Sequence, residues 1–594
     1  MKIPYLGKIM LSWCKGCNVP ILGNRCARCD GKAGKVPVTP PGDVRPAFDS
    51  DIEVINTAVE RHFGCEIIPE GKIVLLNNAP GYDRFDEVIM DGRVAGVLKY
   101  DVKRQEFLFL PRLFGARMLR LNGSKKGYVE IAEDALPYIL KGASVLMPGV
   151  VDFDERIERG DEVIVLCKGE VVGVGSARIS GEEAKKQKKG TFVKVRRCAA
   201  PEKEAPLPGG QDWETVLDAN SAIIEECEKE AMGFVKEVKA SHSKLPKTVA
   251  FSGGKDSLAT LLLVRKVIPD VDVLFTDTGI EFPETVEYTR RIVSDLGLTL
   301  FEESAGDGFW KGMEFFGPPG KDYRWCCKIC KLGPTTRLIL KHFPDGCVSF
   351  IGQRKYESET RARSMRIWKT PWIPIQVGAG PIQHWTALHV WLYIMREGVE
   401  ANELYQEGME RLGCWTCPSS DVAELEILKR LHPEMWKKWN KALGKSGLTK
   451  DEIKYGLWRW RKPTGGSKRF AKEAGITAKA RKAEKRKKSK FNSADFERAA
   501  NLAQILGKVE VFDTFFSVNG ARVLKDGTVE SKSLTDGPLL SDIVQRAQNC
   551  FGCGVCLGQC ESDAIELRDD TAWVNDGCTG CMKCHERCPI VRYG

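Results

Sequence analysis

Residues 248–257 read TVAFSGGKDS, so a short apolar run leads into a glycine-rich turn and then into residues with helical apolar spacing. Paired glycines at Gly253 and Gly254 let the backbone approach an anion closely. Free N–H groups at the start of the helix and the Lys255 ammonium can then neutralise it. The Walker A pattern GxxxxGK[ST] is absent, so this predicts a phosphate loop of a different kind. An ordinary glycine turn that opens a helix is the alternative.

The cysteines offer a second kind of chemistry. The chain has 22 cysteines in 594 residues, and most fall into groups with two residues between neighbours. The N-terminus carries a cysteine pair where a signal peptide would need an apolar core, so we expect a cytoplasmic protein. In that compartment such groups indicate metal sites rather than disulfides. Five cysteines outside the groups are expected to be small buried hydrophobes: Cys65, Cys167, Cys198, Cys227 and Cys347.

Two closely spaced cysteine pairs near the N-terminus predict a zinc ribbon in residues 1–35. Four thiolates in a tetrahedron suit a closed, structural Zn²⁺ site. A rubredoxin-type iron site is the alternative, because an all-thiolate tetrahedron also suits iron. The expected ligands are Cys14, Cys17, Cys26 and Cys29.

Residues 546–594 contain the C-x₂-C-x₂-C-x₃-C pattern of bacterial ferredoxins twice, the second time followed by Pro589. The fourth cysteine of each run ligates the other cluster, which predicts two [4Fe–4S] clusters. The first is expected on Cys550, Cys553, Cys556 and Cys588. The second is expected on Cys578, Cys581, Cys584 and Cys560. Glu561 replaces the first proline of the pattern without affecting ligation, and the three-residue final gap argues against zinc.

The length and the order of apolar runs predict a multidomain α/β protein of about three to six domains. Strands and helices alternate inside residues 213–465, which predicts a doubly wound, mostly parallel sheet. Ligands of such sheets sit beyond the carboxyl ends of strands, so Ser252 and Asp277 should meet at one crevice. No apolar run reaches the roughly 18 residues of a membrane span.

The remaining segments are predicted from composition and turn signals. Residues 36–46 and 199–210 are rich in proline and glycine, which indicates linkers. The net charge of +10 and the Lys/Arg-rich run 468–490 fit a nucleic-acid or nucleotide partner, with a solvated linker as the alternative. The expected units are a zinc ribbon (1–35), a small α+β module (50–127), a β-barrel (128–199), the parallel-sheet domain (213–465), a basic linker (466–495), a small α/β segment (496–545) and a ferredoxin-like α+β domain (546–594).

Residues 252–257 resemble the PP-loop of the adenine-nucleotide α-hydrolase superfamily, whose members bind ATP or a sulfonucleotide. Further motifs are DTGIEFPET at 277–285, Cys326-Cys327, GQR at 352–354 with Glu357, Ser358 and Arg361, Pro381-Ile382 with Trp385, and Gly413-Cys414 with Cys417. Their order is similar to that in archaeal-type phosphoadenosine- and adenosine-phosphosulfate (PAPS and APS) reductases, over about residues 245–425. Residues 128–197 resemble a PUA domain, an RNA-binding barrel of tRNA- and rRNA-modifying enzymes, with a generic packing barrel as the alternative.

The resemblance implies a role for each matching residue. Phosphate would be held by Ser252, Gly253, Gly254, Lys255, Asp256 and Ser257, and adenosine would be bordered by Asp277, Thr278 and Gly279. Sulfate or phosphate would be gripped by Gln353, Arg354 and Arg361, because guanidinium forks suit oxyanions. A third [4Fe–4S] cluster, with a zinc knuckle as the alternative, would be held by Cys326, Cys327, Cys414 and Cys417. Lys255, Asp256 and Arg354 are the implied catalytic residues.

One departure from the family pattern concerns the nucleophile. The reductases end their catalytic domain with a Glu-Cys-Gly-Leu-His-like motif whose cysteine attacks sulfur, and this chain has no cysteine between Cys417 and Cys550. It has instead a fifth thiol, Cys330, which is an alternative ligand, a reactive catalytic thiol or a spectator. Either Cys330 replaces the missing nucleophile, or the ferredoxin domain delivers electrons directly.

Three functions fit these residues. The first is an APS or PAPS reductase that releases sulfite with electrons from its own iron–sulfur clusters and an electron donor. The alternative is an ATP-dependent tRNA or RNA sulfurtransferase, with magnesium at the pyrophosphate, because the PUA-like domain and basic segment favour an RNA partner. A redox-sensing RNA-binding protein without enzymatic activity fits least well, since an intact phosphate loop indicates nucleotide chemistry. The sequence leaves the oligomeric state open.

Overall fold

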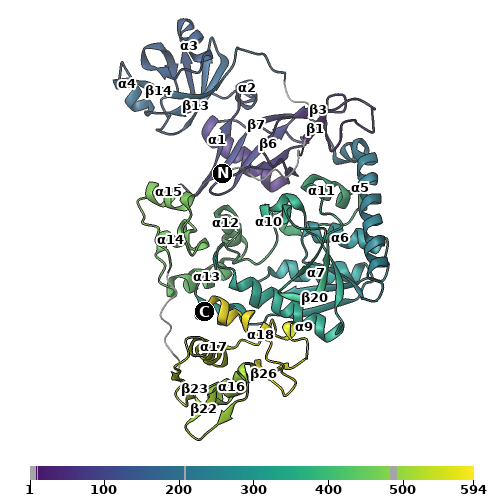
Figure 1. Cartoon of the computed structure of the whole chain (residues 1–594). Helices are drawn as coiled ribbons and strands as arrows, with labels where there is room; N and C mark the ends of the chain where they lie inside the picture. Colours follow the sequence, from purple (N-terminus) through teal and green to yellow (C-terminus); the bar gives the residue numbers. More distant parts are fainter. Residues whose placement is uncertain (1–8, 10, 206–208, 482–490) are drawn as a thin grey trace.

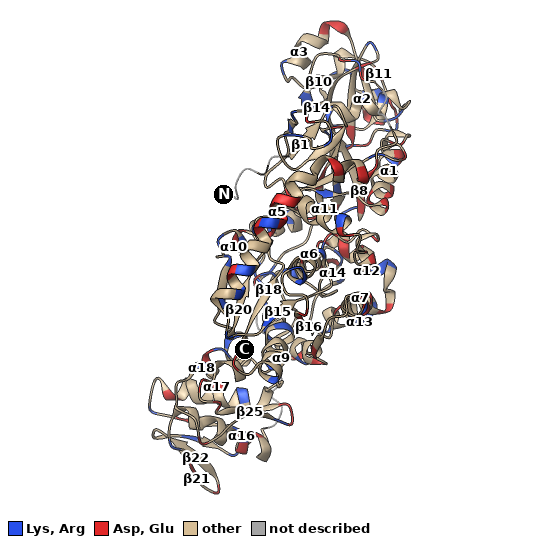
Figure 2. Ribbon diagram, turned by 90° about the vertical axis from the view of Figure 1, so that its right-hand side faces the viewer, with Lys and Arg blue, Asp and Glu red and all other residues tan. Residues whose placement is uncertain are grey.

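The computed structural model describes residues 9, 11–205, 209–481 and 491–594. Its modules follow one another along a row, with residues 128–199 at one end, the C-terminal module at the other and a parallel sheet between them (Figures 1 and 2). The predicted multidomain α/β architecture is confirmed. Within the described ranges, we find no helix with the length and apolar character that crossing a membrane requires.

The N-terminal unit is a three-stranded antiparallel sheet of order β2-β1-β3 that packs against a long helix, α5 (Trp213–Ser241). Its strands are β1 (Leu11–Cys14), β2 (Val19–Ile21) and β3 (Gly34–Val36). The amide of Asn220 in α5 joins the two elements, because it accepts from Leu22 N–H at 2.8 Å and donates to Pro20 O at 2.9 Å. The small sheet is thereby fixed to the helix that leads into the parallel sheet.

A second module combines two helices with an antiparallel sheet of order β4-β5-β6-β7-β8. Its elements are β4 (Arg45–Pro46), α1 (Asp49–Phe63), β5 (Leu75–Asn78), β6 (Phe85–Met90), β7 (Arg93–Asp101), β8 (Glu106–Pro111) and α2 (Leu113–Leu121). The sequence predicted residues 36–46 to be a linker, but the end of this segment is strand β4. Arg45 is held there by an ion pair to Asp51 at 2.7 Å, a partner in α1 that composition does not reveal.

The barrel that follows has the strand order β10-β14-β13-β12-β9-β11, with β9 and β12 parallel and the other neighbours antiparallel. Its elements are β9 (Tyr128–Ile131), α3 (Leu136–Leu140), β10 (Val145–Leu146), β11 (Val150–Phe153), β12 (Glu162–Cys167), β13 (Glu170–Ala177), α4 (Gly181–Lys186) and β14 (Thr191–Cys198). Gly175 permits the close pairing of β13 and β14, because a Cβ there would lie 2.3 Å from Lys194 O. Of the predicted linker 199–210, residues 206–208 lie outside the described residues.

The central domain contains a six-stranded sheet of order β17-β16-β15-β18-β20-β19. Its elements are α5 (Trp213–Ser241), β15 (Lys247–Ala250), α6 (Lys255–Arg265), β16 (Asp272–Asp277), α7 (Pro283–Asp295), β17 (Leu300–Ser304), α8 (Gly308–Phe316), α9 (Gly333–His342), β18 (Cys347–Ile351), α10 (Glu359–Ala362), β19 (Ile367–Thr370), β20 (Ile373–Ala379) and α11 (Ala387–Glu397). All neighbours are parallel except β19, an antiparallel edge strand that the alternation of elements did not reveal.

Helices cover both faces of this sheet. The helices α5, α6, α7 and α11 share the largest core with residues of β15, such as Val249. On the other face, α9 packs Leu338 and Ile339 against Leu274 of β16. The sheet is therefore wound on both sides, and its carboxyl ends remain the edge at which a ligand can bind.

The helices after the sheet return the chain to the second module. They are α12 (Val422–Leu431), α13 (Pro433–Lys445), α14 (Lys450–Lys454) and α15 (Gly465–Glu473). The beginning of the predicted basic linker is helix α15, in which Phe470 stacks on Tyr82 with ring centroids 4.5 Å apart. This aromatic contact explains why the segment begins as a packed helix. Residues 482–490 of the basic run lie outside the described residues.

The C-terminal module begins with an antiparallel sheet of order β21-β22-β23-β24 between two helices. Its elements are α16 (Ser493–Ala503), β21 (Glu510–Val511), β22 (Phe515–Val518), β23 (Ala521–Leu524), β24 (Val529–Glu530), α17 (Asp536–Asn549), β25 (Ile565–Arg568), β26 (Thr571–Val574), α18 (Lys583–Glu586) and α19 (Pro589–Tyr593). The cysteine runs lie on either side of the β25–β26 hairpin.

Candidate functional site

The phosphate loop connects β15 to α6 at the carboxyl edge of the sheet. Gly253 has φ of +72°, and a Cβ there would lie 2.9 Å from atoms of Thr285 and Thr289. Only glycine fits this turn without displacing α7. The hydroxyl of Ser257 accepts from the Ser252 N–H at 3.2 Å, which closes the loop over the start of α6. The loop thus has the backbone shape that an anion site requires.

The N–H of Lys255, the first residue of α6, donates to the hydroxyl of Tyr405 at 2.9 Å. Tyr405 is buried, and burial raises the pKa of its hydroxyl well above the ordinary value. Sequence reasoning missed Tyr405 because it lies 150 residues after Lys255, outside every motif. A bound phosphate would compete with this hydroxyl for the helix N-terminus.

A buried network of charges lies beside the loop. Asp256 pairs with Lys255 at 2.9 Å and with Arg354 at 2.5 Å, and Arg354 also pairs with Asp43 at 2.8 Å. Burial disfavours the charged carboxylate of Asp256, but the charges of Arg354 and Lys255 outweigh it and hold the pKa of Asp256 below its usual range. Asp43 was missed because it lies in the segment predicted as a linker.

The three residues expected to grip sulfate are placed differently from one another. Arg354 is only 3% exposed and is paired to two carboxylates, so it positions Asp256 and is not open to an oxyanion in this arrangement. Gln353 donates to the Ser364 hydroxyl at 2.8 Å, and Arg361 is partly exposed in an ion pair with Glu357.

The loop after β16 holds the residues expected to border adenosine. Gly279 N–H donates to Asp277 at 2.8 Å, and a Cβ on Gly279 would lie 2.2 Å from Gly306 O, so the turn requires glycine. The hydroxyl of Thr278 contacts Glu281 at 2.9 Å and the sulfur of Cys414 at 3.4 Å. This loop therefore connects the nucleotide crevice to the cysteine group of the same domain.

The cysteine group of the central domain comes from two loops. Cys326 directly precedes a π-helical turn, Cys327–Leu332, which leads into α9. Cys414 and Cys417 lie in the loop before α12. Cys326 and Cys414 pack against the same hydrophobic cluster. Arg324 joins the two loops, because its Nη2 lies 3.3 Å from the sulfur of Cys327 and its Nη1 donates to the hydroxyl of Ser419, two residues after Cys417, at 2.7 Å. Burial and Glu281 raise the pKa of Cys414.

The charge environment of Cys327 favours a thiolate. A hydrogen bond from Cys326 and the charge of Arg324 hold the pKa of Cys327 well below its ordinary value. Arg324 Nη2 lies 3.3 Å from the sulfur of Cys327. A thiolate held by a partly buried cation is a suitable ligand for a metal group.

The N-terminal cysteines fit a single tetrahedral ion. Their four sulfurs all lie within 4.8 Å of one another, with Cys14 and Cys29 at 3.4 Å and Cys17 and Cys26 at 3.8 Å. A tetrahedron with Zn–S bonds of 2.3 Å would place the sulfurs about 3.8 Å apart. Among the described residues, no other set of three or more Cys, His, Asp or Glu ligand atoms is this compact. Over the described part of the chain, the other three cysteine groups are wider than this.

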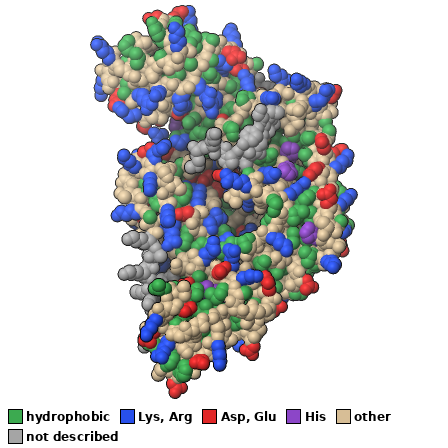
Figure 3. Space-filling model, in the orientation of Figure 1, with side chains coloured by type: hydrophobic (Ala, Val, Ile, Leu, Met, Phe, Trp, Pro, Cys, Tyr) green, Lys and Arg blue, Asp and Glu red, His purple; other side chains and the backbone are tan. Residues whose placement is uncertain are grey.

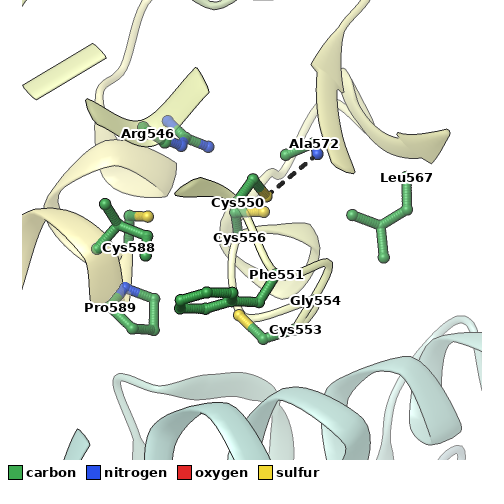
Figure 4. Close-up of a pocket in the computed structure, with 11 residues that line it drawn as sticks. Arg546, Cys550, Phe551, Cys553, Gly554, Cys556, Leu567, Ala572, Cys588 and Pro589 are labelled. Carbon is green, nitrogen blue, oxygen red and sulfur yellow. Dashed lines mark hydrogen bonds between the residues drawn. The ribbon is translucent and has the colours of Figure 1, made fainter. Parts of the chain in front are cut away.

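The first predicted ferredoxin set is brought together around one cavity (Figure 4). The sulfurs that line it belong to Cys550, Cys553, Cys556 and Cys588. In the second set, Cys584 is buried and its sulfur lies 3.9 Å from Nη1 of Arg546, whereas Cys581 is exposed. The cavity therefore brings Cys588 together with the first run of cysteines, and both ligand sets stay predictions.

The first set docks onto α9, the helix that follows the turn with Cys327. Arg337 of α9 donates to the carbonyl oxygens of Gly552 at 3.1 Å and Cys553 at 2.9 Å. Gly333 permits this approach, because a Cβ there would lie 2.2 Å from Cys553 O. Cys330 lies at this junction and is 2% exposed, and burial raises its pKa well above the ordinary value. A buried, protonated thiol is a poor nucleophile.

Known protein families match two of these modules. The phosphoadenosine phosphosulfate reductase domain matches residues 246–420, and the PUA domain matches residues 127–199. An uncharacterized protein of Methanocaldococcus jannaschii is 40% identical over 470 residues, which cover 77% of this chain and 97% of that protein. An adenosine 5'-phosphosulfate reductase of Geobacillus kaustophilus is 29% identical over 191 residues, which cover 30% of this chain and 75% of that protein.

A solved structure of a phosphoadenylyl-sulfate reductase also matches part of this chain. The phosphoadenylyl-sulfate reductase of Candida auris, in complex with phosphate, is 18% identical, covers 32% of this chain and 94% of its own, and has a TM-score of 0.26. The family matches identify two domains of the chain, and the similarity to the Methanocaldococcus protein extends over most of its length. The chain carries a phosphoadenosine phosphosulfate reductase domain of the PP-loop superfamily and a PUA domain.

Proposed function

We propose that this protein is a sulfonucleotide reductase that splits APS or PAPS into sulfite and AMP or PAP, using electrons that enter through its own ferredoxin module. The observation that carries the proposal is the docking of the first ferredoxin cysteine set onto α9, the helix that follows the turn with Cys327, through Arg337 and the carbonyl oxygens of Gly552 and Cys553. An electron-transfer module fixed against a nucleotide domain supports a reaction that consumes electrons.

The reaction balances with two electrons. They reduce the sulfate sulfur to the oxidation level of sulfite, the bond between that sulfur and the bridging phosphate oxygen breaks, and the nucleotide phosphate leaves with the bonding electrons. Iron–sulfur clusters on the three wider cysteine groups would supply one-electron reducing equivalents. The electron donor is a partner of the ferredoxin module, and the Cys14 group would hold a structural zinc ion.

The residues of the phosphate loop would bind and orient the nucleotide. The N–H groups of Gly254 and Lys255 and the Lys255 ammonium would neutralise the α-phosphate side. Asp256, fixed by Arg354, would hold that ammonium in place. Asp277, Thr278 and Gly279 would position the adenosine so that the sulfate end lies toward Cys414. The reaction needs no thiol nucleophile in this arrangement, which agrees with the burial of Cys330.

The PUA domain supports a second candidate, an ATP-dependent RNA sulfurtransferase. This chain matches the PUA family over residues 127–199. The resemblance implies an RNA-binding module of the kind found in RNA-modifying enzymes. On the face drawn in Figure 3, Lys and Arg side chains gather beside a hollow near the centre of the molecule. Such a surface attracts phosphates without reading sequence.

The two candidates differ in what they consume and release. Anaerobically purified, cluster-loaded protein would be reduced with viologen and given APS, PAPS or ATP, with and without total tRNA. Sulfite release from APS or PAPS is the result expected of a reductase. Pyrophosphate release from ATP that needs tRNA, without any sulfite, would favour the sulfurtransferase.

A further inference from the structure

A buried arginine lies between the two ferredoxin cysteine sets. Arg546 is on α17, one turn before Cys550, and its side chain is 1% exposed. Its Nη1 lies 3.9 Å from the sulfur of Cys584, a member of the second set, and its Nη2 has no hydrogen-bond partner. No carboxylate of the described residues lies within ion-pair distance of this guanidinium.

The charges that face Arg546 come from both cysteine sets. It lines the same cavity as Cys550, Cys556 and Cys588 of the first set (Figure 4). Together with Cys584 at 3.9 Å, the cysteines around this guanidinium come from both sets. Sulfur is therefore the counter-charge that this cation has available.

An unpaired buried guanidinium is costly, because it loses its hydration and gains no partner. An anionic group bound in this cavity would give the Nη2 of Arg546 the partner that it lacks. A [4Fe–4S] cluster with four thiolate ligands carries a net negative charge, and that charge grows on reduction. A fixed positive charge then stabilises the reduced form more than the oxidised form, and net charge is one of the factors that set cluster potentials.

We propose that Arg546 is the shared counter-charge of the two ferredoxin clusters and raises the reduction potential of both. Arginine suits this position, since its guanidinium stays charged when buried and its fork presents donors in two directions. The inference concerns the ferredoxin module alone and holds for either reaction of the nucleotide domain. Absence of sulfite in the assay above would leave it standing.

The test compares Arg546→Gln, which removes the charge, with Arg546→Lys, which keeps it, in the full-length protein. Arg568→Gln is the matched control, because Arg568 is in the same module but its side chain is 57% exposed. Iron and sulfide are measured after anaerobic reconstitution, and both reduction steps are followed by EPR during a potentiometric titration. At a fixed potential, R546Q should lower the ratio of reduced to oxidised cluster at least tenfold, a shift of about 59 mV for one electron. R546K should shift less, and R568Q should match the wild type.

Other results would overturn the proposal. The proposal fails if the reduction potentials of R546Q equal those of the wild type, or if only one cluster shifts. It also fails if the potentials of R546K are as low as those of R546Q, because the lysine keeps the charge. If R546Q fails to hold iron, retention of both clusters by R546K supports the role of the charge, whereas loss from both variants contradicts it. A wild-type protein that binds zinc instead of iron at these cysteines would also refute it.

Discussion

The hydroxyl of Thr278 lies 3.4 Å from the sulfur of Cys414. Thr278 belongs to the loop that follows β16 at the carboxyl edge of the sheet, whereas Cys414 belongs to the cysteine group of the same domain. The contact places the predicted nucleotide crevice and the predicted cluster ligands side by side, although 136 residues separate them in the chain. A substrate held by the phosphate loop would therefore have its reacting end near these thiolates.

Replacing Lys255 by alanine should remove the one flexible cation of the phosphate loop. We expect kcat/KM for the nucleotide to fall roughly 100-fold, the effect of deleting one preorganised group that stabilises transition-state charge. Sulfite formation from APS at several concentrations measures this. Lys236→Ala, at an exposed position of α5, is the matched control and should retain wild-type kinetics. Equal activity of K255A and wild type would remove Lys255 from the site.

Replacing Asp43 by asparagine should destabilise the central domain. Asp43 pairs with the buried Arg354 and also accepts from Ala387 N–H at 2.6 Å. Removing a charged partner from a buried cation lowers the free energy of unfolding by several kcal/mol. We expect a loss of about 2–3 kcal/mol here, because Asp256 still pairs with Arg354. Urea unfolding of the two proteins gives the difference.

The control for that variant is Glu359→Gln, which breaks the exposed pair to Arg363. An exposed pair contributes less than about 1 kcal/mol, so this variant should unfold almost as the wild type does. If D43N and E359Q unfold alike, the buried network does not hold the domain together.

The stability of the central domain should depend on pH through His389. Burial is the main cause that lowers the pKa of His389 to about 4 from the ordinary value of 6.5. Between these values the unfolded chain binds a proton that the folded protein excludes, so stability falls as pH falls from 6.5 toward 4. At pH 5 the loss would approach about 2 kcal/mol. Thermal unfolding of wild type and His389→Gln from pH 7 to 5 should show a steeper decline in the wild type, and parallel curves would contradict this.

The N-terminal cysteines should bind zinc, and their loss should affect stability but not redox properties. Cys26→Ser is expected to lower the zinc content measured by elemental analysis and to lower the melting temperature, because the small sheet packs against α5. Iron content should remain unchanged. Cys198→Ser, outside all cysteine groups, is the control and should keep its zinc. Iron in place of zinc in the wild type would favour the rubredoxin-type alternative.

Local patterns predicted much of this fold. The strand, the glycine turn and the helix around Lys255 were predictable because each depends on neighbouring residues. The crossed ferredoxin pattern anticipated the grouping of Cys588 with Cys550, although the cysteine ligands themselves stay predictions.

Long-range contacts explain what the sequence did not reveal. Asp43 reaches Arg354 from a segment that composition describes as a linker, and only the fold brings them together. Tyr405 binds the start of α6 without belonging to any motif. The segment predicted as a basic linker begins as a packed helix because Phe470 stacks on Tyr82, a contact that its charges did not reveal.

The most direct test of the proposed reductase is the release of sulfite by reduced, cluster-loaded protein without any thiol reductant. We predict sulfite and AMP or PAP in equal amounts from APS or PAPS, lost in K255A and kept in Cys330→Ser. Absence of sulfite from both nucleotides, with pyrophosphate released from ATP only when tRNA is present, would contradict the reductase and favour an RNA sulfurtransferase.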